Sequence, residues 1–103
     1  MMKDSSSEEI KKIRLDKWLW CARFLKTRTL ATNFCTENRV RINGHAVQKA
    51  GAFIQVGDIL TFAWQNNIAV VKVLGIPIHR GPSSEAKKLY EKIDQPVPPV
   101  SRD

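Results

Sequence analysis

Between residues 14 and 58 the chain reads Arg-Leu-Asp-Lys-Trp-Leu (14–19), then Lys-Thr-Arg-Thr-Leu-Ala (26–31), Arg-Val-Arg-Ile-Asn-Gly (39–44) and finally Val-Gly-Asp (56–58). The apolar residues of the first two pieces recur at helical spacing, whereas those of the third alternate with polar ones. The first pattern is typical of amphipathic helices and the second of a half-buried strand. We therefore expect two helices followed by a β-hairpin, with the rest of the chain packed on this unit.

The first helix is predicted from about Leu15 to Phe24. Its apolar residues share one face: Leu15, Trp18, Leu19 and Ala22. Trp20 lies off this face, so it either packs on a later element or is an exposed aromatic side chain. Asp16 has a structural explanation, because it can pair with a nearby arginine or cap the helix.

The second helix is predicted to begin after Thr27, whose hydroxyl can accept a hydrogen bond from a backbone amide of the first turn. Its apolar face repeats the helical spacing: Leu30, Ala31, Phe34 and Cys35. Asn38 suits a left-handed residue at the end of this helix. Because residues 25–26 form a short connection, the helices must cross closely, which places Lys26 and Arg28 at their corner.

The later elements are predicted to be strands and one short helix. Residues 39–42 alternate, with the apolar side chains toward the core and both arginines outward, and Asn43-Gly44 is a strong signal for a two-residue hairpin turn into residues 45–48. Strands at 59–64 and 68–74 complete a small, mainly antiparallel sheet. Near the C-terminus, Ser83 or Ser84 can cap a short helix whose apolar side is Leu89, Tyr90 and Ile93. The predicted fold class is α+β.

The positive charge is concentrated in one part of the chain. From Lys11 to Lys49 there are ten lysines and arginines against two acidic residues, a local charge of +8, whereas the rest of the 103 residues carries −1 of the total of +7. Such localisation favours a surface that binds a polyanion over charge that is spread for solubility. The chain has room for one domain and lacks an apolar run of membrane-spanning length or a secretory signal, so we expect a soluble, cytoplasmic protein.

The candidate RNA-binding residues are seven cations of the segment together with two polar residues: Arg14, Lys17, Lys26, Thr27, Arg28, Arg39, Arg41, Asn43 and Lys49. Guanidinium and ammonium groups neutralise phosphates and release condensed counterions. Thr27 marks a helix start that favours phosphate, and Asn43 lies in a turn that can approach an RNA backbone. A solvated charged face, a helix cap and an ordinary turn are the alternatives. Trp20 and Trp64 could stack on a base or pack in the core.

No catalytic, cofactor or metal site is expected. His45 and His79 each stand alone, without a second ligand or a nucleophile. The five glycines are scattered, so no phosphate-cradling loop forms. Cys21 and Cys35 are too few for a disulfide framework or a zinc site and are expected to be buried free thiols.

Five pieces of the segment occur in a fixed order: Arg14-Leu15-Asp16-x-x-Leu19, Thr27-Arg28-x-x-Ala31, Val40-Arg41-Ile42-Asn43-Gly44-x-x-Val47, Lys49 and Val56-Gly57-Asp58. In this order and spacing they resemble the S4 RNA-binding domain. The resemblance implies that structured RNA is bound by the helix pair and the adjoining strand edge. It implies an RNA-binding role for all the candidate residues except Lys26. The sequence departs from the usual pattern at Thr27, Asn38 and residues 49–51.

Three flanking pieces narrow the family: Lys17-Trp18-Leu19-Trp20, Arg23-Phe24-x-Lys26-Thr27-Arg28 and Arg80-Gly81-Pro82-x-x-Glu85-Ala86-x-x-Leu89-Tyr90. They are similar to the heat shock protein 15 family of small bacterial S4 proteins. This resemblance implies a non-enzymatic protein that binds ribosomal RNA of large subunits stalled with a nascent chain on tRNA and helps return them to use under heat stress. Transfer RNA is a further candidate partner, DNA a weak and non-specific one, and no membrane or small-molecule substrate is expected.

We expect three parts: an N-terminal arm at residues 1–12, an S4 RNA-binding domain with following strands at 13–76, and a C-terminal extension with a short helix and a proline-rich tail at 77–103. Two other functions stay open. S4 modules also precede pseudouridine synthase domains, so the chain could serve an RNA-modification system. A basic module could instead dock on a protein or on an anionic membrane.

Overall fold

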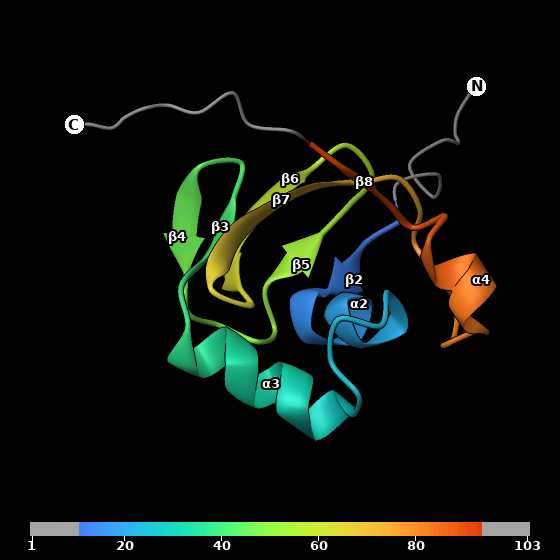
Figure 1. Ribbon diagram of the computed structural model, residues 1–103, viewed down its shortest axis with the longest axis horizontal. Helices are drawn as coiled ribbons and strands as arrows, with labels where there is room; N and C mark the ends of the chain where they lie inside the picture. Colours follow the sequence, from blue (N-terminus) through green and yellow to red (C-terminus); the bar gives the residue numbers. More distant parts are fainter. Residues whose placement is uncertain (1–10, 94–103) are drawn as a thin grey trace.

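The computed structural model describes residues 11–93, and these residues form a sheet with a helix pair on one side. The five-stranded sheet has the order β4-β3-β6-β7-β8, and α2 (Leu15–Cys21) and α3 (Arg28–Glu37) lie together against one of its faces (Figure 1). Its antiparallel strands are β3 (Val40–Ile42), β4 (His45–Val47), β6 (Ile59–Trp64), β7 (Asn67–Val73) and β8 (Tyr90–Lys92). A separate pair, β2 (Ile13–Arg14) and β5 (Phe53–Ile54), lies beside α2. The predicted α+β class is confirmed.

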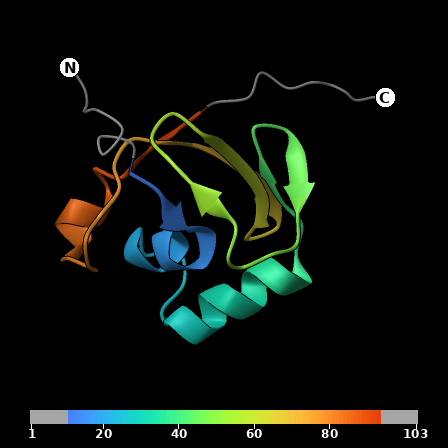
Figure 2. The same cartoon turned by 180° about the vertical axis from the view of Figure 1, so that it is seen from behind.

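The core lies between the helix pair and the sheet. The predicted face of α2 is buried, and Trp18 is fully enclosed, with its indole Nε1 donating to the Gly75 carbonyl at 3.0 Å. On the sheet side, the core includes Leu60 and Phe62 of β6, both of which are buried. Each such large side chain contributes about 1.5–3 kcal/mol when it leaves water. Seen from behind, α3 runs below the β3–β4 hairpin (Figure 2).

The first helix ends earlier than predicted, at Cys21 instead of Phe24. Arg23 has φ 69°, its amide donates to the Trp20 carbonyl at 3.1 Å, and the Phe24 amide donates to the Leu19 carbonyl at 3.0 Å. These two bonds form a Schellman C-cap, here with arginine at the position that glycine usually takes. Phe24 lies beyond the helix, and the centre of its ring is 5.4 Å from the centre of the Phe62 ring. A long-range aromatic contact therefore favours ending the helix before Phe24.

The second helix begins as predicted and ends differently. The Thr27 hydroxyl accepts the Leu30 amide at 3.0 Å, which confirms the cap. Ala31 and Cys35 are fully buried, whereas Leu30 is 48% exposed. The left-handed end predicted at Asn38 is wrong, since that residue is extended (φ −117°) and its side-chain amide donates to the Phe34 carbonyl instead. The chain therefore passes directly from helix to strand.

The hairpin turn at Asn43-Gly44 is confirmed, with φ values of 52° and 88°. The C-terminal prediction is only partly right. The helix α4 (Ser83–Ala86) is a single turn that follows Pro82, without a side-chain cap from serine, and Tyr90 belongs to strand β8. Tyr90 leaves the helix because the edge of β7 offers backbone partners, and it pairs there with Val73.

Two further expectations concern membrane-spanning segments and the ends of the chain. No helix among residues 11–93 is long and apolar enough to cross a membrane. Most of the predicted N-terminal arm, and the proline-rich tail from residue 94, lie outside the described residues.

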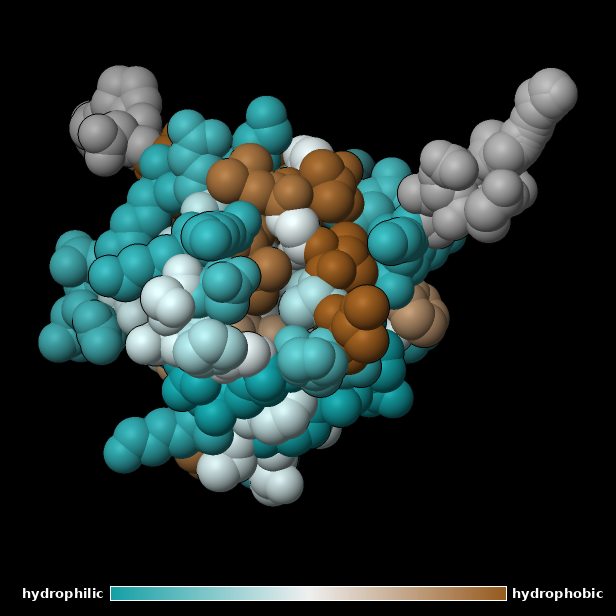
Figure 3. Space-filling view, turned by 90° about the vertical axis from the view of Figure 1, so that its right-hand side faces the viewer, coloured by the Kyte–Doolittle hydropathy of each residue, from teal (hydrophilic) through white to brown (hydrophobic). Residues whose placement is uncertain are grey.

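The face seen from the α4 side carries a band of hydrophobic side chains framed by hydrophilic ones (Figure 3). Among residues 11–93, the exposed large apolar residues are Leu30, Phe53, Val56, Ile68, Leu74 and Ile78.

Candidate RNA-binding surface

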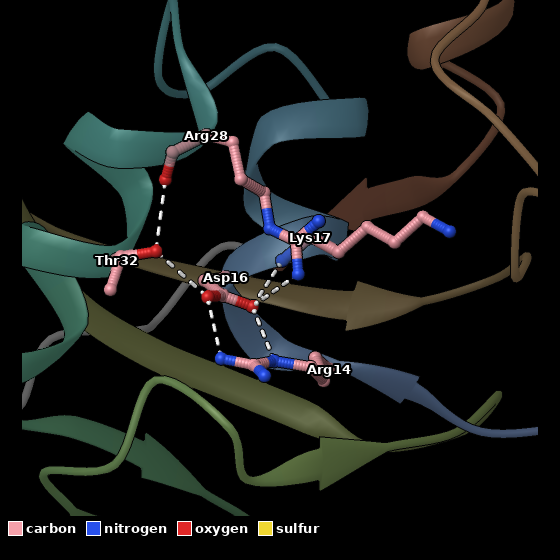
Figure 4. Close-up of polar contacts among 5 residues, drawn as sticks. All are labelled: Arg14, Asp16, Lys17, Arg28 and Thr32. Carbon is pink, nitrogen blue, oxygen red and sulfur yellow. Dashed lines mark hydrogen bonds and ion pairs between the residues drawn. The ribbon is translucent and has the colours of Figure 1, made fainter.

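A buried carboxylate organises the basic surface of the helix pair. Asp16, in the first turn of α2, is only 1% exposed. The Arg14 guanidinium donates to both of its oxygens, from Nε to Oδ1 at 3.2 Å and from Nη2 to Oδ2 at 3.1 Å (Figure 4). The Lys17 amide donates to Oδ1 at 2.7 Å. A two-pronged contact of this kind fixes the guanidinium plane as well as its position.

The same carboxylate joins α2 to α3. Arg28 donates from Nη2 to Asp16 Oδ1 at 3.3 Å, and the Thr32 hydroxyl donates to Oδ2 at 2.8 Å (Figure 4). The Thr32 hydroxyl also lies 3.0 Å from the Arg28 carbonyl, one helical turn earlier. The side chains of Arg14 and Arg28 are 47% and 40% exposed. Asp16 therefore orients both guanidinium groups while part of each stays open to solvent.

Charge compensation keeps Asp16 ionised. Burial raises the pKa of this carboxyl, but hydrogen bonds from Arg14 and Thr32 and the charges of Arg28 and Arg14 outweigh it, so its pKa lies below the usual 3.8. The result is an anion with two guanidinium neighbours, which leaves the group with net positive charge. Removing the anion would therefore release both cations from their fixed positions.

Four further candidates lie around this group. The Lys17 side chain points away from the carboxylate and is partly exposed (Figure 4). Lys26 and Thr27 are exposed at the corner between the helices. The Thr27 hydroxyl is used by its own helix cap. Lys49 is exposed in the loop that meets the start of α2, where the Asp16 amide donates to the Ala50 carbonyl at 3.2 Å.

The hairpin candidates form a second group. Arg39 and Arg41 are exposed, and Arg41 donates from Nη1 to the Gly44 carbonyl at 3.2 Å. Arg41 pairs with Thr61 on the sheet face turned away from the helices. Within residues 11–93 no hydrogen bond or ion pair links these two arginines to Asp16. Asn43 is engaged in the fold, accepting the Ile59 amide at 2.9 Å and donating to Asp58 at 3.0 Å.

Comparison with known proteins identifies the chain. The S4 domain model matches residues 13–60. Heat shock protein 15 of Escherichia coli K12 is 38% identical over 93% of this chain and 69% of its own length. The "RQC P-site tRNA stabilizing factor" of Halalkalibacterium halodurans is 35% identical over 82% of this chain and 96% of its own length. The chain belongs to the heat shock protein 15 family. It is thus an S4-domain, RNA-binding protein of a ribosome-associated family.

A solved structure from this family has the same fold. The trimeric heat shock protein 15 of Vibrio cholerae superposes with a TM-score of 0.73, at 34% identity, over 81% of this chain and 83% of that one. The superposition confirms the S4-type architecture expected from the sequence. Because the S4 match ends at residue 60, the strands β7 and β8 and helix α4 lie beyond it.

Sequence reasoning missed two polar residues that shape the surface of this family member. Thr32 ties α3 to Asp16, and a threonine four positions after Arg28 was the available signal. Arg80 lies with its guanidinium carbon 5.3 Å from the centre of the Trp20 ring. It belonged to a motif that indicated the family, but its position next to α2 depends on the tertiary fold.

The cysteines behave as predicted. Cys21 and Cys35 are buried free thiols, and burial raises the pKa of Cys35 to about 12. Burial also raises the pKa of Cys21, so the reactive thiolate form is disfavoured at both positions. Among the described residues there is no cluster of three or more histidine, cysteine or acidic side chains that could hold a metal ion. Trp64 packs against Phe24 and Phe34 in the aromatic cluster of the core.

Proposed function

We propose that this protein binds ribosomal RNA of the large subunit without catalysing a reaction, and acts on subunits stalled with a nascent chain on tRNA. The observation that carries the proposal is the pair of guanidiniums, Arg14 and Arg28, held by buried Asp16 and open to solvent. Oriented forks of this kind match phosphate oxygens, and they lose less freedom on binding than flexible cations do. The proposed contact residues are Arg14, Lys17, Lys26, Thr27, Arg28, Arg39, Arg41, Asn43 and Lys49.

Arg28 has a donor left for such a ligand. Its Nε is buried and has no hydrogen-bond partner within the described residues. An unpaired buried donor costs about 1–3 kcal/mol. A phosphate oxygen that draws the guanidinium slightly outward would relieve this cost, which favours an anionic partner at this corner of the helix pair.

Co-sedimentation tests the proposal. Full-length protein is mixed with free large subunits, large subunits carrying nascent chain–tRNA, or small subunits, at two salt concentrations. We expect preferential binding to the subunits that carry nascent chain–tRNA, with affinity falling as salt rises. Arg28→Ala should weaken binding by about 1–3 kcal/mol, whereas Lys72→Ala removes one exposed charge from β7 and should leave binding unchanged. Equal binding to small subunits would contradict the proposal.

A second candidate function is stabilisation of tRNA in the P site. The relative with that printed function is covered over 96% of its length by this chain, against 69% for the Escherichia coli heat shock protein. The rate at which labelled tRNA leaves large subunits separates the two functions. A slower rate with added protein, in the absence of a nascent chain, favours tRNA stabilisation, and an unchanged rate favours binding to ribosomal RNA alone. In both cases we expect a cytoplasmic protein.

A further inference from the structure

Trp20 and Arg80 form a half-buried pair at the edge of the core, against which Trp20 packs. The Arg80 guanidinium carbon lies over the Trp20 ring, 5.3 Å from its centre, and Arg80 Nε donates to the Trp20 carbonyl at 3.1 Å. The other two tryptophans serve packing, since Trp18 is fully buried and Trp64 joins the aromatic cluster. Trp20 also packs against the core, but it is the tryptophan that has an arginine over its ring within residues 11–93.

A second contact fixes the loop that carries Arg80. Arg23 donates from Nη2 to the Gly81 carbonyl at 2.7 Å, across 58 positions of sequence. Arg23 is the left-handed residue that ends α2, so both contacts join the loop to the same helix end. The guanidinium of Arg80 is thus held in place without being buried. Holding a planar cation at the surface is what a stacking site for a ligand requires.

The pair lies on the same side of α2 as the basic surface. Lys17 precedes Trp20 by three positions, so the two side chains are neighbours on one helix face. Lys17, Arg80 and Arg28 all lie near the Cys21 thiol. Burial raises the pKa of this thiol, and the charges of the three cations oppose the rise. Positive charge therefore extends from the Asp16 group along α2 to the C-terminal extension.

We propose that Arg80 and Trp20 form a stacking platform for one unpaired RNA nucleotide, with Lys17 neutralising its phosphate. The platform rests on the proposed RNA-binding function and extends that surface beyond residue 60, where the S4 match ends. Unpaired bases stack on aromatic rings and on guanidinium planes, and this stacking tolerates any base. The platform therefore selects for an unpaired nucleotide beside a structured RNA and not for a sequence.

Two RNA probes test the platform with the full-length protein. One is a blunt RNA hairpin, and the other is the same hairpin with a three-adenosine 3′ overhang. Wild type should bind the overhang RNA more tightly, by about tenfold, as expected for one stacked base. Arg80→Lys keeps the positive charge but lacks the planar guanidinium on which a base could stack. This variant should lose the preference for the overhang RNA while binding the blunt hairpin normally. Lys87→Ala, at an exposed lysine of the same extension, should keep the preference.

The outcomes separate the platform from its alternatives. Overhang preference that persists in Arg80→Lys and in Trp20→Leu, with both variants folded by near-ultraviolet circular dichroism, would overturn the platform. An equal loss for both RNAs in Arg80→Lys would mean that Arg80 only fastens the loop. If wild type binds neither hairpin nor large subunits, the proposed function fails first. Quenching of tryptophan fluorescence by the overhang RNA, absent in Trp20→Leu, supports the stacked base directly.

Discussion

The helix pair and the β3–β4 hairpin both present arginines to solvent, but they hold them in different ways. Arg14 and Arg28 bind a carboxylate that is 1% exposed, whereas Arg41 donates to the neutral Gly44 carbonyl. In the helix pair, the negative charge of Asp16 neutralises one of the two positive charges and fixes the geometry of both guanidinium groups. The hairpin arrangement keeps its full charge and leaves the side chain freer. A preorganised cation loses less entropy on binding, so the helix pair is expected to set affinity more than the hairpin.

The largest expected effect is that of Asp16→Asn on stability. The substitution removes the anion that receives two guanidiniums, the Thr32 hydroxyl and the Lys17 amide, and we expect a loss of about 3 kcal/mol, discounted for the exposure of both arginines. Asp58→Asn is the matched change on the hairpin side, where we expect about 1 kcal/mol. Urea unfolding of both variants measures the difference. Equal losses would remove the distinction between the regions.

Substitutions in the turn of the hairpin should lower the stability of the protein more than substitutions of its arginines. Asn43 combines φ 52° with two side-chain hydrogen bonds, so Asn43→Ala should cost about 2 kcal/mol. Asn43→Gly relieves the backbone strain and should cost less than alanine. Thermal unfolding of the two variants ranks them. Arg41→Ala serves as the control and should change stability by less than about 0.5 kcal/mol, since it is an exposed surface substitution.

RNA affinity should rank the two regions in the same order. Arg28→Ala is expected to weaken binding to large subunits by about 2 kcal/mol, and Arg41→Ala by about 1 kcal/mol. Both should lower the slope of affinity against salt, because each removes a phosphate-neutralising charge. Titration at several salt concentrations measures both quantities. A larger loss for Arg41 than for Arg28 would assign the main contact to the hairpin.

The smallest expected effect is the pH dependence of the Asp16 contribution. Its folded pKa is depressed below 3.8, so the stabilisation is fully present above the unfolded pKa and is lost as pH falls through the folded value. The stability difference between wild type and Asp16→Asn should be constant from pH 7 to about pH 5 and shrink below about pH 4. Urea unfolding at these pH values checks it. A difference that grows on acidification would mean that the carboxyl is already protonated in the fold.

The sequence predicted the elements whose causes are local. The buried face of α2, the Thr27 cap and the Asn43-Gly44 turn are confirmed, because each depends on residues only a few positions apart. Where long-range partners compete, prediction failed. Phe24 leaves the helix for the aromatic cluster, and Tyr90 leaves a predicted helix for the edge of β7. The pair of β2 with β5 was missed because each has only two residues.

The candidate site divides in the same way. Localised charge indicated the segment that carries the proposed binding surface, which stays a prediction. The ordered motifs indicated the family, which the comparisons confirm. Sequence left two roles open for Asp16, pairing with a nearby arginine or capping the first helix, and the structure shows the pairing with Arg14. The Asp16 partners Arg28 and Thr32 could not be read from spacing alone, because they reach it from another helix. Nothing in the described residues tests the boundary expected at residue 76, which stays a prediction.

By itself, the sequence determined the helix pair, the hairpin, the concentration of positive charge between residues 11 and 49, and the S4 family. The tertiary structure decided which of those charges are fixed, because a carboxylate orients a guanidinium only when packing buries it and brings both helices within hydrogen-bond reach. It also decided that Arg80 lies beside Trp20, 60 positions away in sequence. Charge is a property of composition, whereas the direction in which a charge points depends on contacts between distant segments.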